Sequence, residues 1–153
     1  MMLAERFTLA EFQHSNTATR LGIENRVPSH LMDNLTALAR SMQKIRDFLG
    51  QPILISSGYR CPELNRRVGG SPTSHHRFAA AADWICPAFG TPLDCARAIE
   101  PHIDQWRITQ LIAEFAEADG SGWVHTSILP VSPVNRVISI DRLGTRTGIL
   151  PAR

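Results

Sequence analysis

The chain has 153 residues, of which 43% are hydrophobic and 20% charged, enough to close the core of one globular domain spanning residues 1–153 without disulfide support. Its 16 basic and 14 acidic residues give a formal charge of +2, which is too small for a nucleic-acid binder that depends on counterion release. No apolar run approaches the roughly 18 residues of a membrane span, so we expect no membrane segment.

The first third of the chain is predicted to be mainly helical. Thr8 and Glu11 have the spacing of a capping box, which predicts a short helix there. Between Ser29 and Gly50, leucine, isoleucine and methionine recur every three or four residues, which indicates an amphipathic helix. The β-branched run PILISS at residues 52–57 then predicts a buried strand.

Helices and strands alternate in the middle of the chain. CPELNRRVGG at residues 61–70 predicts a short helix that runs into a glycine loop, and FAAAADWIC at residues 78–86 predicts a strand. TPLDCARAIEPHI at residues 91–103 predicts a helix capped by Thr91. ITQLIAEF at residues 108–115 fits a strand or a helix on periodicity alone.

Two alternating segments, GWVHTSIL at residues 122–129 and NRVISID at residues 135–141, complete the pattern as strands. Early helices followed by late strands indicate the α+β class. We predict a small antiparallel sheet with N-terminal helices packed on it, in a single domain.

A group of side chains suited to metal chemistry surrounds the alanine run. In SHHRFAAAAD, at residues 74–83, a histidine and Asp83 are separated by small residues that allow close backbone approach, and His125 lies in WVH. Two imidazoles and a carboxylate would give a catalytic zinc site with one open position. The spacing is not specific, however: Asp83 capping a turn, His76 on a surface loop and His125 in a half-buried strand explain the residues equally well.

The order of the motifs resembles that of the M15 peptidase family. The resemblance rests on FTLAEF, the segment from residue 34 to SGYR, CPELNRRVGG, SxHxxxxAxD and WVH, and it runs from about Phe7 to Ile140. Members are zinc enzymes that cleave peptidoglycan peptides, and include D-alanyl-D-alanine carboxypeptidases and phage-type L-alanyl-D-glutamate endopeptidases. The resemblance implies Zn²⁺-dependent hydrolysis of peptide bonds in peptidoglycan stem peptides, by either kind of cleavage.

The resemblance also implies the metal ligands. The family motif SxHxxGxAxD and its C-terminal histidine fall on His76, Asp83 and His125, and His75 is the second choice for a ligand. The glycine of that motif is Ala79 here, which is costly if the position needs the left-handed region of φ.

Three further residues are candidates for substrate binding. The resemblance places a contact to a substrate carboxylate at Arg60, and a guanidinium can fork onto a carboxylate in a way that lysine cannot copy. Arg60 could instead only tie the strand end to a nearby acidic residue. Asn65 and Ser74 are weaker candidates, because loop-ordering hydrogen bonds would explain them as well.

The general base is the main departure from the family pattern. In relatives with an acid three residues before the last histidine, that acid activates water, and here the position is Gly122. Glu114 could replace it if its strand pairs with WVH, and Asp119 is the second candidate. The missing acid keeps open an alternative function, a non-catalytic cell-wall-binding or phage structural module that retains the fold.

The N-terminal segment and the cysteines bear on location. MMLAERFTLAEF lacks the apolar core of a signal peptide, and three cysteines are too few for a disulfide framework. We therefore expect synthesis in the cytoplasm with reduced thiols, and action on the cell wall after release, as for a phage or prophage enzyme. A single domain of this size is most simply a monomer.

Overall fold

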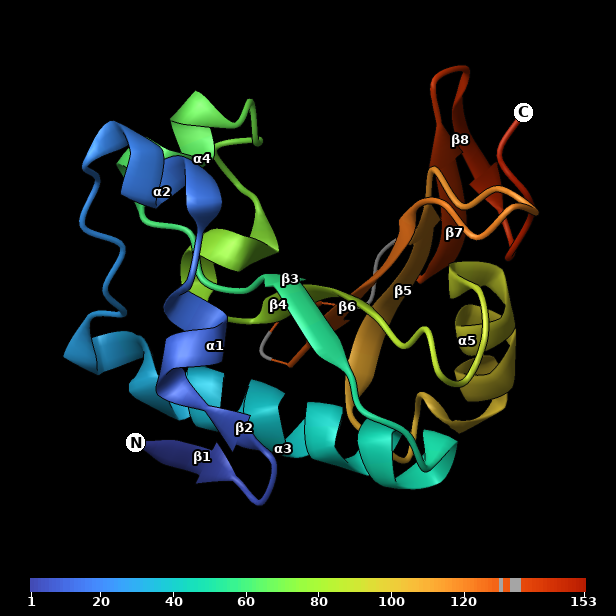
Figure 1. Cartoon of the computed structure of the whole chain (residues 1–153), viewed down its shortest axis with the longest axis horizontal. Coiled ribbons are helices and arrows are strands. Elements are labelled where there is room, and N and C mark those ends of the chain that lie inside the picture. Colours follow the sequence, from blue (N-terminus) through green and yellow to red (C-terminus); the bar gives the residue numbers. More distant parts are fainter. Residues whose placement is uncertain (130, 133–135) are drawn as a thin grey trace.

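The computed structural model describes residues 1–129, 131–132 and 136–153 (Figure 1). Within these residues it forms a six-stranded sheet with strand order β3-β4-β6-β5-β7-β8 and a separate pair, β1-β2. The strands are β1 (Met2–Ala4), β2 (Phe7–Thr8), β3 (Leu54–Ser57), β4 (Ala81–Ile85), β5 (Ile108–Glu114), β6 (Trp123–Ile128), β7 (Val137–Asp141) and β8 (Gly144–Thr147).

The helices follow the predicted order. The α-helices are α1 (Leu9–Gln13), α2 (Asn16–Leu21), α3 (Met32–Leu49), α4 (Pro62–Arg67) and α5 (Pro92–Ile99), and the 3-10 turns are η1 (Ser29–Leu31), η2 (His75–Phe78) and η3 (Glu100–His102). The capping box of Thr8 and Glu11 is confirmed at the start of α1, and Thr91 caps α5. In the described part of the chain, no helix has the length and apolar content needed to cross a bilayer.

The sheet differs from the predicted one, although the α+β class holds. It is larger and mixed: β5 and β7 run parallel, while the other neighbours in the sheet are antiparallel. The prediction of a small antiparallel sheet is therefore wrong. Because β4 and β5 occupy both edges of β6, the returning chain cannot pair with β6, and β7 instead pairs with the remaining edge of β5 in the same direction as β5.

The covering helices also differ from the prediction, since they are not all N-terminal. The long helix α3 and the mid-chain helix α5 both contact β6 and each other, so they cover one face of the sheet together. Leu35, Leu38, Met42 and Ile45 of α3 are fully buried in this core. They pack with Trp84, Val124 and Ile128 from the helix-covered face of the sheet.

Two strand predictions need correction in detail. PILISS forms β3, but this strand lies at the edge of the sheet rather than in its interior, and Leu54 is 55% exposed. The segment ITQLIAEF, which periodicity alone did not assign to a strand or a helix, forms strand β5. The predicted strand NRVISID corresponds to β7 from Val137 onward, and its first residue, Asn135, lies outside the described residues.

Candidate metal centre

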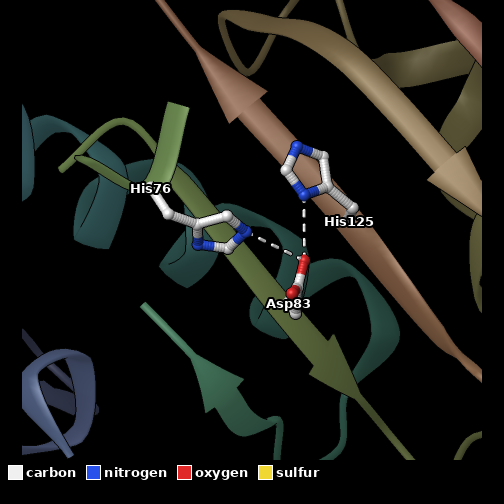
Figure 2. Close-up of side chains that lie close together, drawn as sticks. All are labelled: His76, Asp83 and His125. Carbon is white, nitrogen blue, oxygen red and sulfur yellow. Dashed lines mark hydrogen bonds and ion pairs between the residues drawn. The ribbon is translucent and has the colours of Figure 1, made fainter. Parts of the chain in front are cut away.

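His76, Asp83 and His125 converge from three elements on the sheet face opposite α3 and α5 (Figure 2). Asp83 of β4 lies directly opposite His125 of β6, so their side chains project from the same face, and His76 reaches them from η2. Asp83 Oδ1 lies 2.9 Å from His125 Nδ1 and 3.3 Å from His76 Nε2. One potential ligand atom from each residue lies within 4.8 Å of the others.

Both imidazoles are held so that one ring nitrogen faces Asp83. His76 Nδ1 lies 2.7 Å from the carbonyl oxygen of Gly58, which can only accept, so Nδ1 carries a proton and Nε2 of the neutral ring keeps its lone pair. His125 Nε2 lies 2.8 Å from Ser127 Oγ, and its Nδ1 faces Asp83. Anchoring of the distal nitrogen by the protein is typical of metal-binding histidines.

The Asp83 carboxyl is ionised in this setting. Burial by itself would raise its pKa, but the neighbouring His76 and His125 outweigh that effect and hold the pKa well below its usual range. A carboxylate and two imidazoles, the rings being neutral when they bind a metal, form the donor set of a three-ligand catalytic zinc site. The residues therefore fit a zinc ion, with His76, Asp83 and His125 as its ligands.

A second carboxylate, that of Glu114, approaches the same point. Glu114 ends β5 opposite Trp123, and its Oε1 lies 3.8 Å from His125 Nδ1. Burial and the nearby charge of Asp83 raise its pKa above the usual value of a glutamic acid. The pairing of β5 with β6, which the sequence left open, therefore brings Glu114 to the candidate site.

The backbone explains why no acid stands at position 122. Gly122 has a φ of +87°, a region that favours glycine. A Cβ at this position would lie 2.3 Å from the carbonyl oxygen of Phe115 and 2.5 Å from that of Glu114. The turn therefore excludes a side chain at Gly122, and the acidic group near the cluster comes from the neighbouring strand instead.

Arg60 lies beside the cluster, held by Asn65. Its Nη1 donates to Asn65 Oδ1 at 3.1 Å, and its Nη2 lies 3.9 Å from Asp83 Oδ2. Burial lowers the pKa of Arg60, with partial compensation from Asp83 and Glu114. Asn65 is itself buried and donates to the carbonyl oxygen of Ser71 at 2.7 Å, so it orders the arginine and the loop.

The remaining candidates separate into those at the site and those away from it. Ser74 lines the same pocket, and its Oγ accepts from the backbone N–H of His76, capping η2. Asp119 accepts from the N–H of Ser121 in an exposed turn, outside the pocket that holds Glu114. Ala79 has a φ of +54°, so the departure from glycine does place an alanine in the left-handed region, at a cost of about 1–2 kcal/mol.

Comparison with known families identifies the family of the chain. The family model described as Peptidase M15 matches residues 5–104. The chain belongs to the M15 peptidase family. This matched range contains Arg60, His76 and Asp83, whereas Glu114 and His125 lie beyond it and are brought to the site by β5 and β6. No curated protein matches the chain.

In this M15 peptidase, the cluster opens into a pocket of about 530 Å³. Its lining includes the apolar side chains of Ile112, Trp123 and Ile140 and the polar side chains of Arg60 and Ser74. The sequence analysis did not single out Ile112 or Trp123 for this role. The period of two along a strand was the available signal, because it places Ile112 on the face of Glu114 and Trp123 on the face of His125.

Proposed function

We propose that this M15 peptidase hydrolyses peptide bonds in peptidoglycan stem peptides, with a Zn²⁺ ion held by His76, Asp83 and His125. The observation that carries the proposal is the meeting of this ligand set with the Glu114 carboxylate, 3.8 Å from His125 Nδ1. A zinc ion bound there would supply Lewis-acid polarisation of a carbonyl and a water of lowered pKa.

Glu114 is the general base in this proposal. Its raised pKa brings it closer to the range in which a carboxylate can accept a proton from water and then return it to the leaving amine. Its position on β5 removes the main argument for a non-catalytic module, which rested on the missing acid at Gly122. We therefore favour an enzyme over a wall-binding or phage structural module.

Arg60 supplies the recognition of a substrate carboxylate. Its guanidinium lies in the pocket wall, oriented by Asn65, and could fork onto a carboxylate of the peptide. Stem peptides carry such groups on D-glutamate, on diaminopimelate and at the terminal D-alanine, so the proposal covers both carboxypeptidase and endopeptidase cleavage. In this proposal the enzyme acts on the cell wall and is a monomer.

The test uses Gram-negative murein sacculi with added zinc. We expect the wild type to bind one equivalent of zinc and release muropeptides, and His76→Ala to lose both properties. Glu114→Gln should keep the zinc and lose about 10²- to 10⁴-fold in rate, the usual contribution of a general base. Glu117→Gln, which changes an exposed carboxylate in the next turn, is the matched control and should retain the rate.

Two outcomes would contradict the proposal at different points. Stoichiometric zinc binding by the wild type without release of muropeptides would favour the non-catalytic module. Full activity of Glu114→Gln would remove Glu114 from the role of base and leave the rest of the site intact. Mass spectrometry of the released fragments identifies the bond that is cleaved.

A further inference from the structure

A chain of hydrogen bonds lies behind His125, and the proposed reaction does not use it. Ser127 Oγ lies 2.8 Å from His125 Nε2 and 2.7 Å from His75 Nδ1. Ser127 is fully buried, whereas His75 is partly exposed and lines the pocket. One hydroxyl therefore links a candidate metal ligand to a second histidine in the pocket wall.

When Asp83 is ionised and both rings are neutral, as for groups of ordinary pKa at about pH 8, the number of hydrogens fixes the direction of these hydrogen bonds without metal. An ionised carboxylate can only accept, so His125 Nδ1 then donates to Asp83, and His125 Nε2 accepts from Ser127. The Ser127 hydroxyl has one hydrogen, which is used in that bond. Its oxygen must then accept from His75 Nδ1, so that both rings carry their proton on Nδ1.

Metal ligation by His125 requires the opposite direction. His125 can bind through Nδ1 only if that atom has a free lone pair, so its proton must sit on Nε2 and point at Ser127. The Ser127 hydrogen then turns to His75 Nδ1, and His75 carries its proton on Nε2. One proton leaves from His125 Nδ1 and one is taken up at His75 Nε2, so the total is unchanged.

We propose that Ser127 couples the two rings, so that metal binding by His125 moves the proton of His75 from Nδ1 to Nε2. This inference rests on the metal site of the proposed function. Since Nδ1 of His75 is occupied by Ser127, Nε2 is the nitrogen left for a pocket ligand. His75 thereby becomes a hydrogen-bond donor for a carbonyl or carboxylate oxygen of the substrate only when the metal site is filled.

The strand supplies a matched control for this chain. Thr126 lies between His125 and Ser127 in sequence, but its side chain points to the opposite face of the sheet, where Oγ1 lies 3.5 Å from Met42 Sδ. Thr126→Val removes a buried hydroxyl from the same strand and leaves the hydrogen bonds among His125, Ser127 and His75 in place. Ser127→Ala breaks the chain, and Ser127→Thr keeps a hydroxyl at that position.

The test is nitrogen-15 NMR of the histidine rings at about pH 8, where a histidine of ordinary pKa is neutral, before and after one equivalent of zinc. In the wild type and in Thr126→Val, both His75 and His125 should change from the Nδ1-protonated to the Nε2-protonated form. In Ser127→Ala, His75 should no longer follow His125, and zinc affinity should fall by about 10- to 100-fold, the usual effect of losing a group behind a ligand. Ser127→Thr should restore both.

The outcomes distinguish this inference from the proposed function. If the wild type binds zinc and His125 changes form while His75 does not, the coupling is refuted and the metal site stands. If His75 still follows His125 in Ser127→Ala, Ser127 is not the link. If the wild type binds no zinc, the metal site itself is refuted, and the coupling with it. The wild-type measurement needs no variant, so a misfolded variant cannot obscure it.

Discussion

Two buried carboxylates lie one strand in from opposite edges of the sheet, and they are satisfied in different ways. Asp83 on β4 is 8% exposed and Asp141 at the end of β7 is 6% exposed. Asp141 accepts from Arg153 Nε at 3.0 Å and Nη2 at 3.1 Å, and from the backbone N–H groups of Leu143 and Arg153. Asp83 instead faces two imidazoles, with Arg60 further away at 3.9 Å.

The comparison shows that a lowered carboxyl pKa does not by itself mark a functional site. Hydrogen bonds from Arg153 lower the pKa of Asp141, and the histidines outweigh burial to lower that of Asp83. Arginine is a permanent cation with no lone pair to offer, whereas a neutral imidazole can bind a metal. The partners of each carboxylate, together with the raised pKa of nearby Glu114, separate the candidate metal centre from a structural contact.

The strongest test of this contrast replaces each carboxylate by its amide. Asp83→Asn should lower zinc affinity and murein hydrolysis by more than about 100-fold. Mutation of a residue that only hydrogen-bonds to a metal ligand already lowers affinity or activity by about 10- to 100-fold, and Asp83 is proposed as a ligand itself. Asp141→Asn should lower Tm but leave zinc stoichiometry and rate unchanged. Calorimetry, zinc titration and muropeptide release measure the three quantities. Loss of zinc binding in a folded Asp141→Asn protein would contradict the division.

The two arginines allow a second, smaller test. Arg60→Lys keeps the charge and loses the fork, and we expect kcat/KM to fall by about 10- to 100-fold, because charge-assisted hydrogen bonds contribute about 1.5–3 kcal/mol. Arg153→Lys should alter Tm and not kcat/KM, since Arg153 contacts Asp141. Steady-state kinetics on a purified muropeptide checks both. An unchanged kcat/KM for Arg60→Lys would show that Arg60 does not clamp a substrate carboxylate.

The smallest expected effect is on acid stability. The pKa of Asp141 is lower in the folded protein than the value of about 3.9 for an unfolded chain. Between the pKa of Asp141 in the folded protein and its pKa in the unfolded chain, the unfolded state binds more protons. The stabilisation by Asp141 is therefore present above about pH 4 and is lost as the pH falls further. The Tm difference between wild type and Asp141→Asn should shrink over this range. A constant difference would mean that Asp141 does not titrate in this way.

Local features of the fold followed from the sequence because they depend on neighbouring residues. The capping box of Thr8 and Glu11 and the apolar face of α3 are set by spacings of three and four residues. Partner choice among strands depends on which edges are already occupied, and no periodicity records that. The parallel pairing of β5 with β7 and the edge position of β3 were therefore not predicted correctly.

Some residues of the candidate site were predicted from the sequence, and others required the tertiary structure. Resemblance to a known family placed His76, Asp83 and His125, and the structure brings these three together. The sequence favoured Glu114 over Asp119 only on the condition that the strand of Glu114 pairs with WVH, and the sequence alone does not establish that pairing. The pairing sets Glu114 opposite Trp123 and leaves Asp119 in the turn.

The sequence by itself determined the α+β class, the order of the elements and the residue types able to bind a metal. These features depend on short-range periodicity and on the chemistry of individual side chains. Only the tertiary structure decided which carboxylate joins the cluster, why Gly122 carries no side chain, and how Ser127 connects His75 to His125. These features depend on residues far apart in the chain that meet through strand pairing and on close backbone contacts, and both arise only when the sheet is assembled.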